Sequence, residues 1–298
     1  MRDLKTIFLL EKTQDPHFDL EAAYEALKDH NDSDVHAHLL RLLREELSQI
    51  TSENVPKSLL RFCSISNEKS FIEIKKDIQQ GRLTFSNPFN FNDPMDPILK
   101  VWIKMNKRIE DNSLNKKFFK SVVNALKNLR ICCMADSTVL SENLPLMWSH
   151  YANSHKGIAI KYKITKDTLD RYNDNIHLLR LCPVAYREHK PLTDSITIDN
   201  ALFAKGHCWN YEAEHRLIYF SEITSEFKKK DDTTGKTKRE NYLPLSGFEI
   251  EKVYLGTEIE EKKEKEILKI TRSKNIPTFK MVYDSYDITK LQSELISG

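Results

Sequence analysis

The sequence predicts an α+β protein, with a mixed, largely antiparallel sheet flanked by helices and a helical lead-in before it. Segments with the two-residue period of strands recur from residue 58 onward. Helical segments are interspersed irregularly among them, without the repeated strand–helix alternation of a doubly wound sheet. We therefore expect a helical N-terminal segment over residues 1–54 and a single α+β domain over 55–298.

The first half of the chain predicts helix, strand, helix and strand in that order. "DLEAAYEALKDHNDSDVHAHLLRLLREELSQI" has apolar residues at helical spacing, and "NDSD" offers a cap between two helices. "SLLRFCSI" predicts the first strand. "NEKSFIEIKKDIQQGRL" predicts a helix with Phe71, Ile74 and Ile78 on one face and Gly81 as its C-terminal cap. "RLTFS" predicts the next strand.

The second half predicts mostly strands. After a lysine-rich helical stretch over 98–130, "RICCMA" is compatible with a strand. "GIAIKYKI" alternates between Ile158, Ile160 and Tyr162 on one side and Ala159, Lys161 and Lys163 on the other, as a half-buried strand does. "CPVAYRE" and "HRLIYFSEI" are further candidates. "EFKKKDDTTGKTKREN" predicts an exposed loop, and "EKVYLG", "EEKKEKEILKITRSK" and "TFKMVYD" predict strand, helix and strand.

Composition limits the classes of partner that we expect for this protein. Lys plus Arg number 46 and Asp plus Glu 44, so the net charge is +2. A nucleic-acid partner remains possible through a local basic patch, but the net charge does not indicate one. No run approaches the roughly 18 apolar residues of a membrane span, so we expect no membrane partner. The five cysteines form no C-x-x-C pair and suit a reducing compartment, so we expect a cytoplasmic protein.

The stretch "LPLMWSHYANSHKG" predicts a helix from Pro145, with Gly157 in the left-handed position beyond its end. Trp148, Tyr151 and His155 then share one stripe, while His150 lies off it. The stripe has two interpretations. Its aromatic residues pack in the core while His155 bonds the last carbonyls of the helix, or the stripe lines a cleft. The spacing of the two histidines does not indicate a metal site.

Two other clusters also have a structural and a functional interpretation. "FNDPMD" either forms a rigid turn or helix cap, or it presents Asp93 or Asp96 to a pocket or builds one wall of that pocket. In "YEAEHR", an extended backbone places Glu212, Glu214 and Arg216 on one face. These three either form a structural ion-pair network or leave one glutamate to accept a proton or stabilise positive charge.

Together these clusters resemble a bacterial family known as domain of unknown function 2971. The features that carry the resemblance are "FNFNDPMD", "MWSHYANSHKG", and Lys205 and Trp209 followed by "YEAEHR". Their order and spacing resemble the family over about residues 58–285, and the helical lead-in lies outside the pattern. Family members often have Tyr where this chain has Phe62, after the basic residue Arg61.

More distantly, the arrangement is similar to that of ADP-ribosyltransferases. This resemblance implies that Arg61 holds a phosphate or ribose of NAD and that Tyr151 packs against nicotinamide. It also implies that Glu214 stabilises the oxocarbenium-like ribose, with Glu212 as the second acid of an E-x-E pair. A fixed carboxylate stabilises a cationic transition state, and an aromatic face positions a flat leaving group.

We therefore expect an enzyme that transfers ADP-ribose from NAD to a macromolecular acceptor, as a toxin or defence effector. The expected catalytic residues are Glu212, Glu214 and Tyr151, and the expected cofactor-binding residues are Arg61, Asp93, Trp148, His155 and Arg216. One alternative is a metal-dependent hydrolase or nuclease that uses Asp93, Asp96, Glu212 and Glu214. The other is a binding protein in which these clusters are structural.

Overall fold

The computed structural model describes residues 41, 43–52, 55–91, 93, 96–97, 129–138, 144–172, 177–188, 197–221, 228–230, 237–239, 242–243, 248–287 and 289–298. The helix predicted over 98–130 lies outside them up to residue 128, as does most of the predicted lead-in. Residues 43–48 are helical. Within the described part of the chain, no helix combines the length and apolarity needed to cross a membrane.

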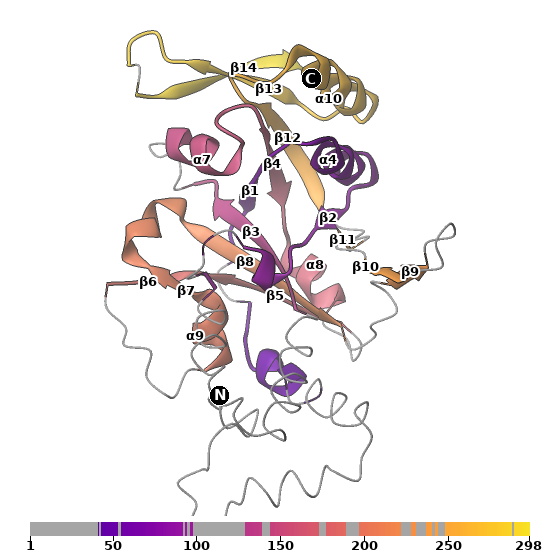
Figure 1. The fold of residues 1–298 in the computed structure, drawn as a ribbon, viewed down its shortest axis with the longest axis vertical. Helices are drawn as coiled ribbons and strands as arrows, with labels where there is room; N and C mark the ends of the chain where they lie inside the picture. Colours follow the sequence, from indigo (N-terminus) through magenta and orange to yellow (C-terminus); the bar gives the residue numbers. More distant parts are fainter. Residues whose placement is uncertain are drawn as a thin grey trace, which may run out of the picture.

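An eight-stranded sheet runs through the molecule, which confirms the predicted α+β class (Figure 1). Neighbouring strands are antiparallel except for β12 and β13, which are parallel. In spatial order the strands are β14 (Leu291–Ser297), β13 (Thr278–Tyr283), β12 (Glu249–Leu255), β4 (Ile158–Lys163), β1 (Ser58–Cys63), β3 (Arg130–Asp136), β8 (Glu214–Ser221) and β5 (His177–Pro183).

Helices and short ladders surround this sheet. The helices are α4 (Glu68–Gln80), α7 (Leu144–Tyr151), α8 (Lys166–Arg171), α9 (Ile198–Phe203) and α10 (Glu261–Ser273), with 3-10 helices η1 (Pro88–Asn90) and η3 (His207–Glu212). Two-stranded ladders join β2 (Leu83–Thr84) to β11 (Tyr242–Leu243), β6 (Ala185–Arg187) to β7 (Ala204–Gly206), and β9 (Lys228–Lys230) to β10 (Thr237–Arg239).

The core has two parts, one on each face of the sheet. Alternation along β1 places Leu59 in the larger cluster, with the apolar faces of α4 and α10. Leu60 belongs to the smaller cluster, with Trp148 of α7. The spacing of Phe71, Ile74 and Ile78 along α4 is confirmed, because all three are buried in the larger cluster. Helices therefore cover both faces of the central strands (Figure 1).

The sheet opens between β1 and β3. Among the described residues, the register of these two strands contains only the pairs Leu59–Asp136 and Leu60–Ala135. Beyond them β1 continues to pair with β4, and β3 continues to pair with β8. The first residues of β3 instead meet Ser86, which exchanges two backbone hydrogen bonds of 2.8 Å with Ile131. The gap between β1 and β3 is the place where the pocket described below forms.

Two glycines next to these elements have different roles. Gly81 adopts a left-handed φ of 62° and ends α4, as predicted. Gly157 does not end α7 in this way, because the left-handed residues after this helix are Asn153, Ser154 and His155. At Gly157 a Cβ atom would lie 2.3 Å from the carbonyl oxygen of Cys63. Gly157 is therefore required for close packing of two backbone segments, and the predicted cap was wrong.

Two further predictions need correction. Residues 228–230 and 237–239 lie in the segment predicted as an exposed loop, yet they pair as the antiparallel strands β9 and β10. The predicted C-terminal order of strand, helix and strand is confirmed in β12, α10 and β13, but the prediction missed β14. That strand pairs with β13 at the edge of the sheet.

Candidate functional site

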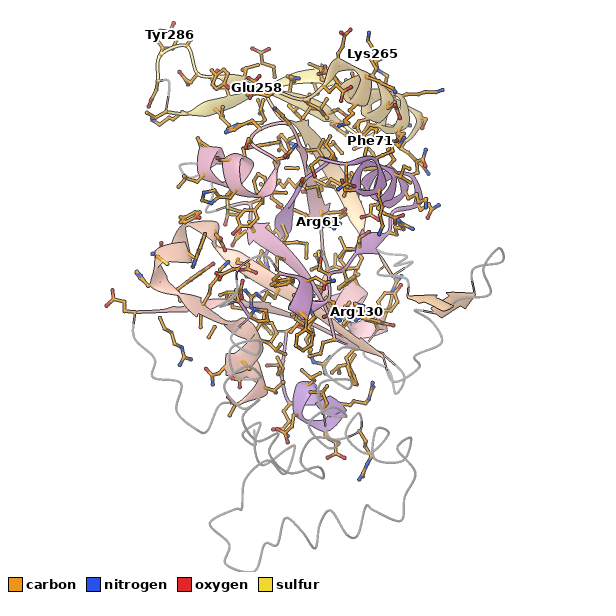
Figure 2. The ribbon with its side chains drawn as sticks, viewed as in Figure 1. Arg61, Phe71, Arg130, Glu258, Lys265 and Tyr286 are labelled. Atoms are coloured by element: carbon orange, nitrogen blue, oxygen red, sulfur yellow. The ribbon has the colours of Figure 1, made fainter. Side chains whose placement is uncertain are left out.

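A pocket of about 550 Å³ lies where β1 and β3 separate. Its volume falls in the range of small-molecule sites in proteins. Arg61 reaches it from β1 and lies near the centre of the molecule (Figure 2). The full lining is Leu60, Arg61, Phe62, Thr84, Ser86, Phe91, Asp93, Asp96, Ile131, Cys132, Cys133, Met134, Ala135, Met147, Tyr151, Lys205, Trp209, Glu212 and Glu214.

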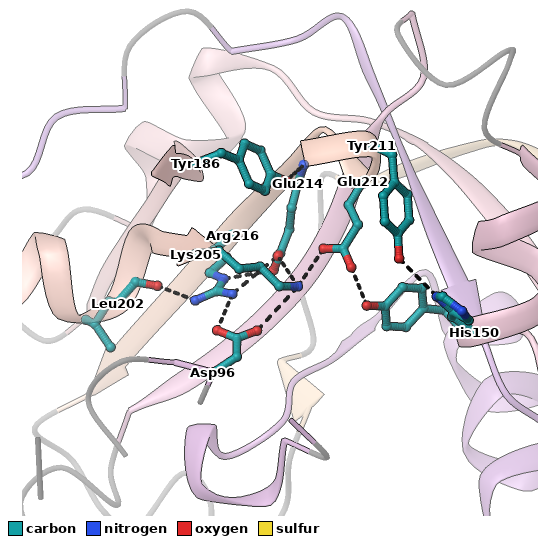
Figure 3. Close-up of polar contacts among 10 residues, drawn as sticks. Asp96, His150, Tyr186, Leu202, Lys205, Tyr211, Glu212, Glu214 and Arg216 are labelled. Atoms are coloured by element: carbon teal, nitrogen blue, oxygen red, sulfur yellow. Dashed lines mark hydrogen bonds and ion pairs between the residues drawn. The ribbon is translucent and has the colours of Figure 1, made fainter. Parts of the chain in front are cut away.

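Lys205 is the centre of the polar network at this pocket (Figure 3). Its ammonium group lies 2.5 Å from Glu212 Oε2, 3.2 Å from Glu214 Oε2 and 3.5 Å from Asp96 Oδ2. It also lies 5.0 Å from the ring centroid of Trp209, within cation–π range. The lysine is buried, and so are the three carboxylates. One cation thus joins β7, η3, β8 and the segment that contains Asp96.

Arg216 forms the second half of the network. Its Nε donates to Glu214 Oε1 at 2.8 Å, and its Nη2 donates to Asp96 Oδ1 at 2.6 Å. Nη1 donates to the carbonyl oxygen of Leu202 at 2.5 Å, at the end of α9. The Arg216 side chain is 0% exposed, so these partners replace water completely. Glu214 is therefore clamped from two sides and Asp96 is held in place.

Glu212 is held differently, because it meets the phenol of Tyr151. The Tyr151 hydroxyl donates a short hydrogen bond to Glu212 Oε1. Lys205 holds the other oxygen of Glu212 (Figure 3). Tyr151 is the last residue of α7 and lines the pocket. Next to it, His150 Nδ1 lies 3.0 Å from the hydroxyl of Tyr211. The ends of α7 and η3 therefore meet through two pairs of polar side chains.

The pKa values of the two glutamates are shifted in opposite directions. Burial favours the neutral acid at both positions. At Glu214 the charges of Arg216 and Lys205 outweigh burial and lower the pKa to about 2. At Glu212 burial, together with the nearby negative charge of Glu214, outweighs Lys205 and Tyr151, and its pKa is raised. Two adjacent carboxyl groups with diverging pKa values are a common feature of acid–base sites.

Arg61 stands at the other wall of the pocket and is anchored from behind. Its Nη1 donates to Asp77 Oδ2 at 3.0 Å, and the same buried carboxylate accepts from Arg82 Nε and from Thr84 Oγ1 at 2.8 Å each. A guanidinium carries five N–H donors, so a group that uses one of them for its anchor still presents a cationic face. The anchor fixes the orientation of Arg61 at the pocket.

Five of the eight predicted site residues line this one pocket: Arg61, Asp93, Tyr151, Glu212 and Glu214. These five residues come from β1, the segment that contains Asp93, α7, η3 and β8. The prediction that Glu214 and Arg216 share a face is confirmed within β8, since they lie two residues apart in a strand. Residues 207–212 form the 3-10 helix η3, so Glu212 is not part of an extended segment as predicted. Ala213, with φ 43°, redirects the chain into β8.

The other three predicted residues do not line the pocket. Trp148 is 0% exposed and packs edge-on against Phe62 at 5.5 Å, so the core interpretation is correct for its ring. His155 follows the end of α7, where the left-handed turn carries it out of the predicted stripe. Its backbone carbonyl accepts from Glu258 N–H at 3.1 Å. Arg216 is beneath the pocket, where it supports Glu214 without reaching the cavity.

The predicted set omitted three residues of the site. Lys205 and Trp209 were part of the motif that carried the family resemblance, but its pattern gave them no role. The sequence indicates Asp96 only as an alternative to Asp93 and as a metal ligand. The signal for Lys205 is electrostatic, since a buried cluster of three carboxylates and one arginine calls for a second cation.

The fold and site define an α+β protein with a charged pocket at the opening of its central sheet. Residues 147–217 match a family model described as "Protein of unknown function (DUF2971)". This segment runs from α7 through η3 into β8 and contains Tyr151, Lys205, Glu212 and Glu214, so the match supports the family resemblance there. No curated protein and no solved structure matches the chain. The similarity to ADP-ribosyltransferases stays a prediction.

Proposed function

We propose that this protein transfers ADP-ribose from NAD, with Glu212 as its principal catalytic carboxylate. The observation that carries the proposal is the meeting of Tyr151, Glu212 and Lys205 at a pocket whose other wall holds Arg61. An aromatic ring, a carboxylate and a guanidinium are the groups that this reaction uses to place nicotinamide, stabilise the ribose and bind phosphate. The assignment differs from the sequence-based one, which placed Glu214 first.

The chemistry needs a carboxylate close to the reacting ribose. When the bond between nicotinamide and ribose breaks, nicotinamide leaves with the bonding electrons and positive charge develops on the ribose. A fixed carboxylate lowers the energy of that charge. The acceptor then forms a new bond to the same carbon and gives up its proton. Glu212 suits both tasks, because it lies at the pocket and its raised pKa makes it a better base than Glu214.

The acceptor in this proposal is a macromolecule, and the setting is the bacterial cytoplasm, where such a reaction would serve a toxin or defence effector. The five cysteines support a reducing compartment, since all five are free thiols and two of them, Cys133 and Cys208, are exposed. A nucleic-acid or protein acceptor is distinguished by whether nuclease or protease removes the transferred label.

Substitution of the two glutamates tests this assignment. Glu212→Gln keeps the size of the side chain but removes its charge, so nicotinamide release from NAD should fall about 10²–10³-fold. Nicotinamide release and labelling of a cell extract from radioactive NAD are measured for the full-length protein. Glu266→Gln is the matched control, because Glu266 pairs with Lys75 away from the pocket. Wild-type rates in Glu212→Gln would remove Glu212 from the reaction, and a wild-type protein that neither binds nor cleaves NAD would reject the class.

No observation favours the two alternatives. Three of the four carboxylates in the metal-dependent alternative, Asp96, Glu212 and Glu214, contact Lys205 or Arg216, two cations of the chain itself. Within the described residues, no group of three His, Cys, Asp or Glu side chains has the geometry of a metal site. The common cleft and the shifted carboxyl pKa values favour a functional site over separate structural clusters.

A further inference from the structure

We propose that Lys205 is a positioning residue, which holds Glu212 against Tyr151 and separates its role from that of Glu214. The inference rests on the proposed function, which needs one carboxylate that exchanges a proton and one that does not. Lys205 contacts both glutamates, and its contact with Glu212 is the shorter one, at 2.5 Å against 3.2 Å. Lys205 therefore connects Glu212, the proposed reactive carboxylate, to Glu214, which Arg216 also holds.

The two carboxylates differ in their other partners. Glu214 has a second cation, because Arg216 bonds it at 2.8 Å. The only ion pair that the described residues provide for Glu212 is with Lys205, and its other oxygen accepts from the neutral phenol of Tyr151. Removal of the lysine charge would thus leave Glu214 paired and Glu212 without a cation. The asymmetry of the network predicts that Lys205 acts mainly on Glu212.

Five titratable side chains of the described residues lie around Glu212. Tyr151 approaches from α7, Tyr186 from β6, Lys205 from β7, Tyr211 from the same 3-10 helix and Glu214 from β8. Of these five, Lys205 is the group that carries positive charge at neutral pH, and its pKa is raised by the carboxylates around it although burial opposes this. Lys205 and Glu214 therefore act on Glu212 with opposite signs.

This opposition gives a test that does not need NAD. Side-chain ¹³C NMR of glutamate-labelled full-length protein follows the titration of Glu212, with Glu212→Gln to assign its signal. Lys205→Met should move the Glu212 titration to higher pH, because the stabilising cation is lost. Glu214→Gln should move it to lower pH, because a neighbouring negative charge is lost. A general loosening of the fold would not move one signal in opposite directions in two variants.

Further variants guard against a folding defect. Lys205→Gln also removes the charge but keeps an amide that can donate to the carboxylates, so it replaces Lys205→Met if that variant does not fold. Lys205→Arg keeps the charge, so the titration of Glu212 should stay close to that in the wild type. Lys280→Met is the control, because Lys280 pairs with Glu264 outside the pocket at 2.7 Å, and it should leave the signal in place.

The outcomes separate this inference from the proposed function. If both neutral Lys205 variants leave the Glu212 titration unchanged, or if they and Glu214→Gln shift it in the same direction, the positioning role is wrong. If the shifts occur as expected but the wild type releases no nicotinamide, the network is as described and the ADP-ribose proposal fails. If both hold, the acid side of the pH–rate profile in Lys205→Arg should follow that of the wild type and in Lys205→Gln should move to higher pH.

Discussion

At Glu214, two buried cations act on one carboxylate, and this has a consequence for the stability of the whole protein. Arg216 is fully buried and bonds both Glu214 and Asp96. Removal of one member from such a group takes a partner away from the buried charges that remain, and breaking a buried ion pair typically costs about 3–5 kcal/mol. The same network that supports the pocket is therefore sensitive to any condition that neutralises one of its members.

Acid is the simplest such condition. The pKa of Glu214 is lowered from 4.5 to about 2, so its contribution to stability is complete above pH 4.5 and is lost as the pH falls toward 2. The full contribution is about 3 kcal/mol on the scale of free energy per pKa shift. Glu212, whose pKa is raised, acts with the opposite sign and stabilises the fold more at low pH than at high pH.

Urea unfolding of the wild type and of Glu214→Gln between pH 2 and 6 measures the contribution of Glu214. We expect the wild type to be more stable above pH 4.5 and the two free energies of unfolding to converge toward pH 2, as Glu214 of the wild type takes up a proton and loses the charge that glutamine lacks at every pH. A difference that stays constant across this range would show that the Glu214 charge is not what stabilises the network. Glu266→Gln, at an exposed ion pair, should change little at any pH.

Among the elements, the turn from α7 into β4 depends on one residue without a side chain. A Cβ atom on Gly157 would lie 2.3 Å from the Cys63 carbonyl oxygen and 2.8 Å from that of Ala152. Both are backbone atoms, so the clash cannot be relieved by a change of rotamer. Gly157→Ala should lower the free energy of unfolding by about 1–3 kcal/mol or more, as overpacked cores do.

Gly206→Ala is the comparison for this substitution. Gly206 has φ −62° and ψ 143°, and the nearest atom to its added Cβ is Cys208 Sγ at 3.6 Å, an ordinary contact. It should therefore change stability by no more than a few tenths of a kcal/mol. Equal urea midpoints for the two variants would contradict the close approach of Gly157 to the backbones of Cys63 and Ala152.

The elements that the sequence predicts are those with regular spacing of apolar residues. β1, α4, β3, β4, β12, α10 and β13 follow from apolar spacing and from capping residues such as Gly81. Residues 207–213 do not, because Tyr211 to Arg216 alternate as a strand would, while the chain forms a 3-10 helix and then turns at Ala213. An alanine with positive φ gives no turn signal, since glycine or asparagine is the usual residue there.

The candidate site was predictable only in part for a related reason. Motif spacing brought together Tyr151, Glu212 and Glu214, but the partners of these residues are set by long-range contacts. Asp96 and Arg216 are 120 positions apart in the chain and meet at 2.6 Å. Trp148 and Tyr151 share a predicted stripe, yet one is buried in the core and the other reaches the pocket. Local pattern alone cannot divide such a stripe between core and cavity.

In the whole molecule, residues 43–52, within the predicted lead-in, contact the opposite end of the sheet from β14. Leu43, Leu47 and Ile50 are buried, and Arg180 of β5 donates to the carbonyl oxygens of Ser48 and Ile50. The backbone N–H of Leu181 donates to Ser52 Oγ at 2.9 Å. Residues 43–52 thus cover the outer edge of β5, where a strand would otherwise present unpaired groups.

Truncation tests whether the predicted boundary near residue 54 separates two independent units. We expect the fragment 53–298 to unfold at a lower temperature than the full chain, because each buried Leu or Ile side chain contributes roughly 1.5–3 kcal/mol. Leu47→Ala in the full chain should cost about 2–5 kcal/mol, without removing any other segment. Thermal unfolding by circular dichroism measures both, and a fragment as stable as the full chain would establish the predicted division.

The separation of β1 from β3 after two residue pairs affects how the protein would select what it binds. Residues 60–62 of β1 and 131–135 of β3 line the cavity, so the distance between these two strands contributes to its width. The size of a ligand that fits then depends in part on how far the two strands diverge.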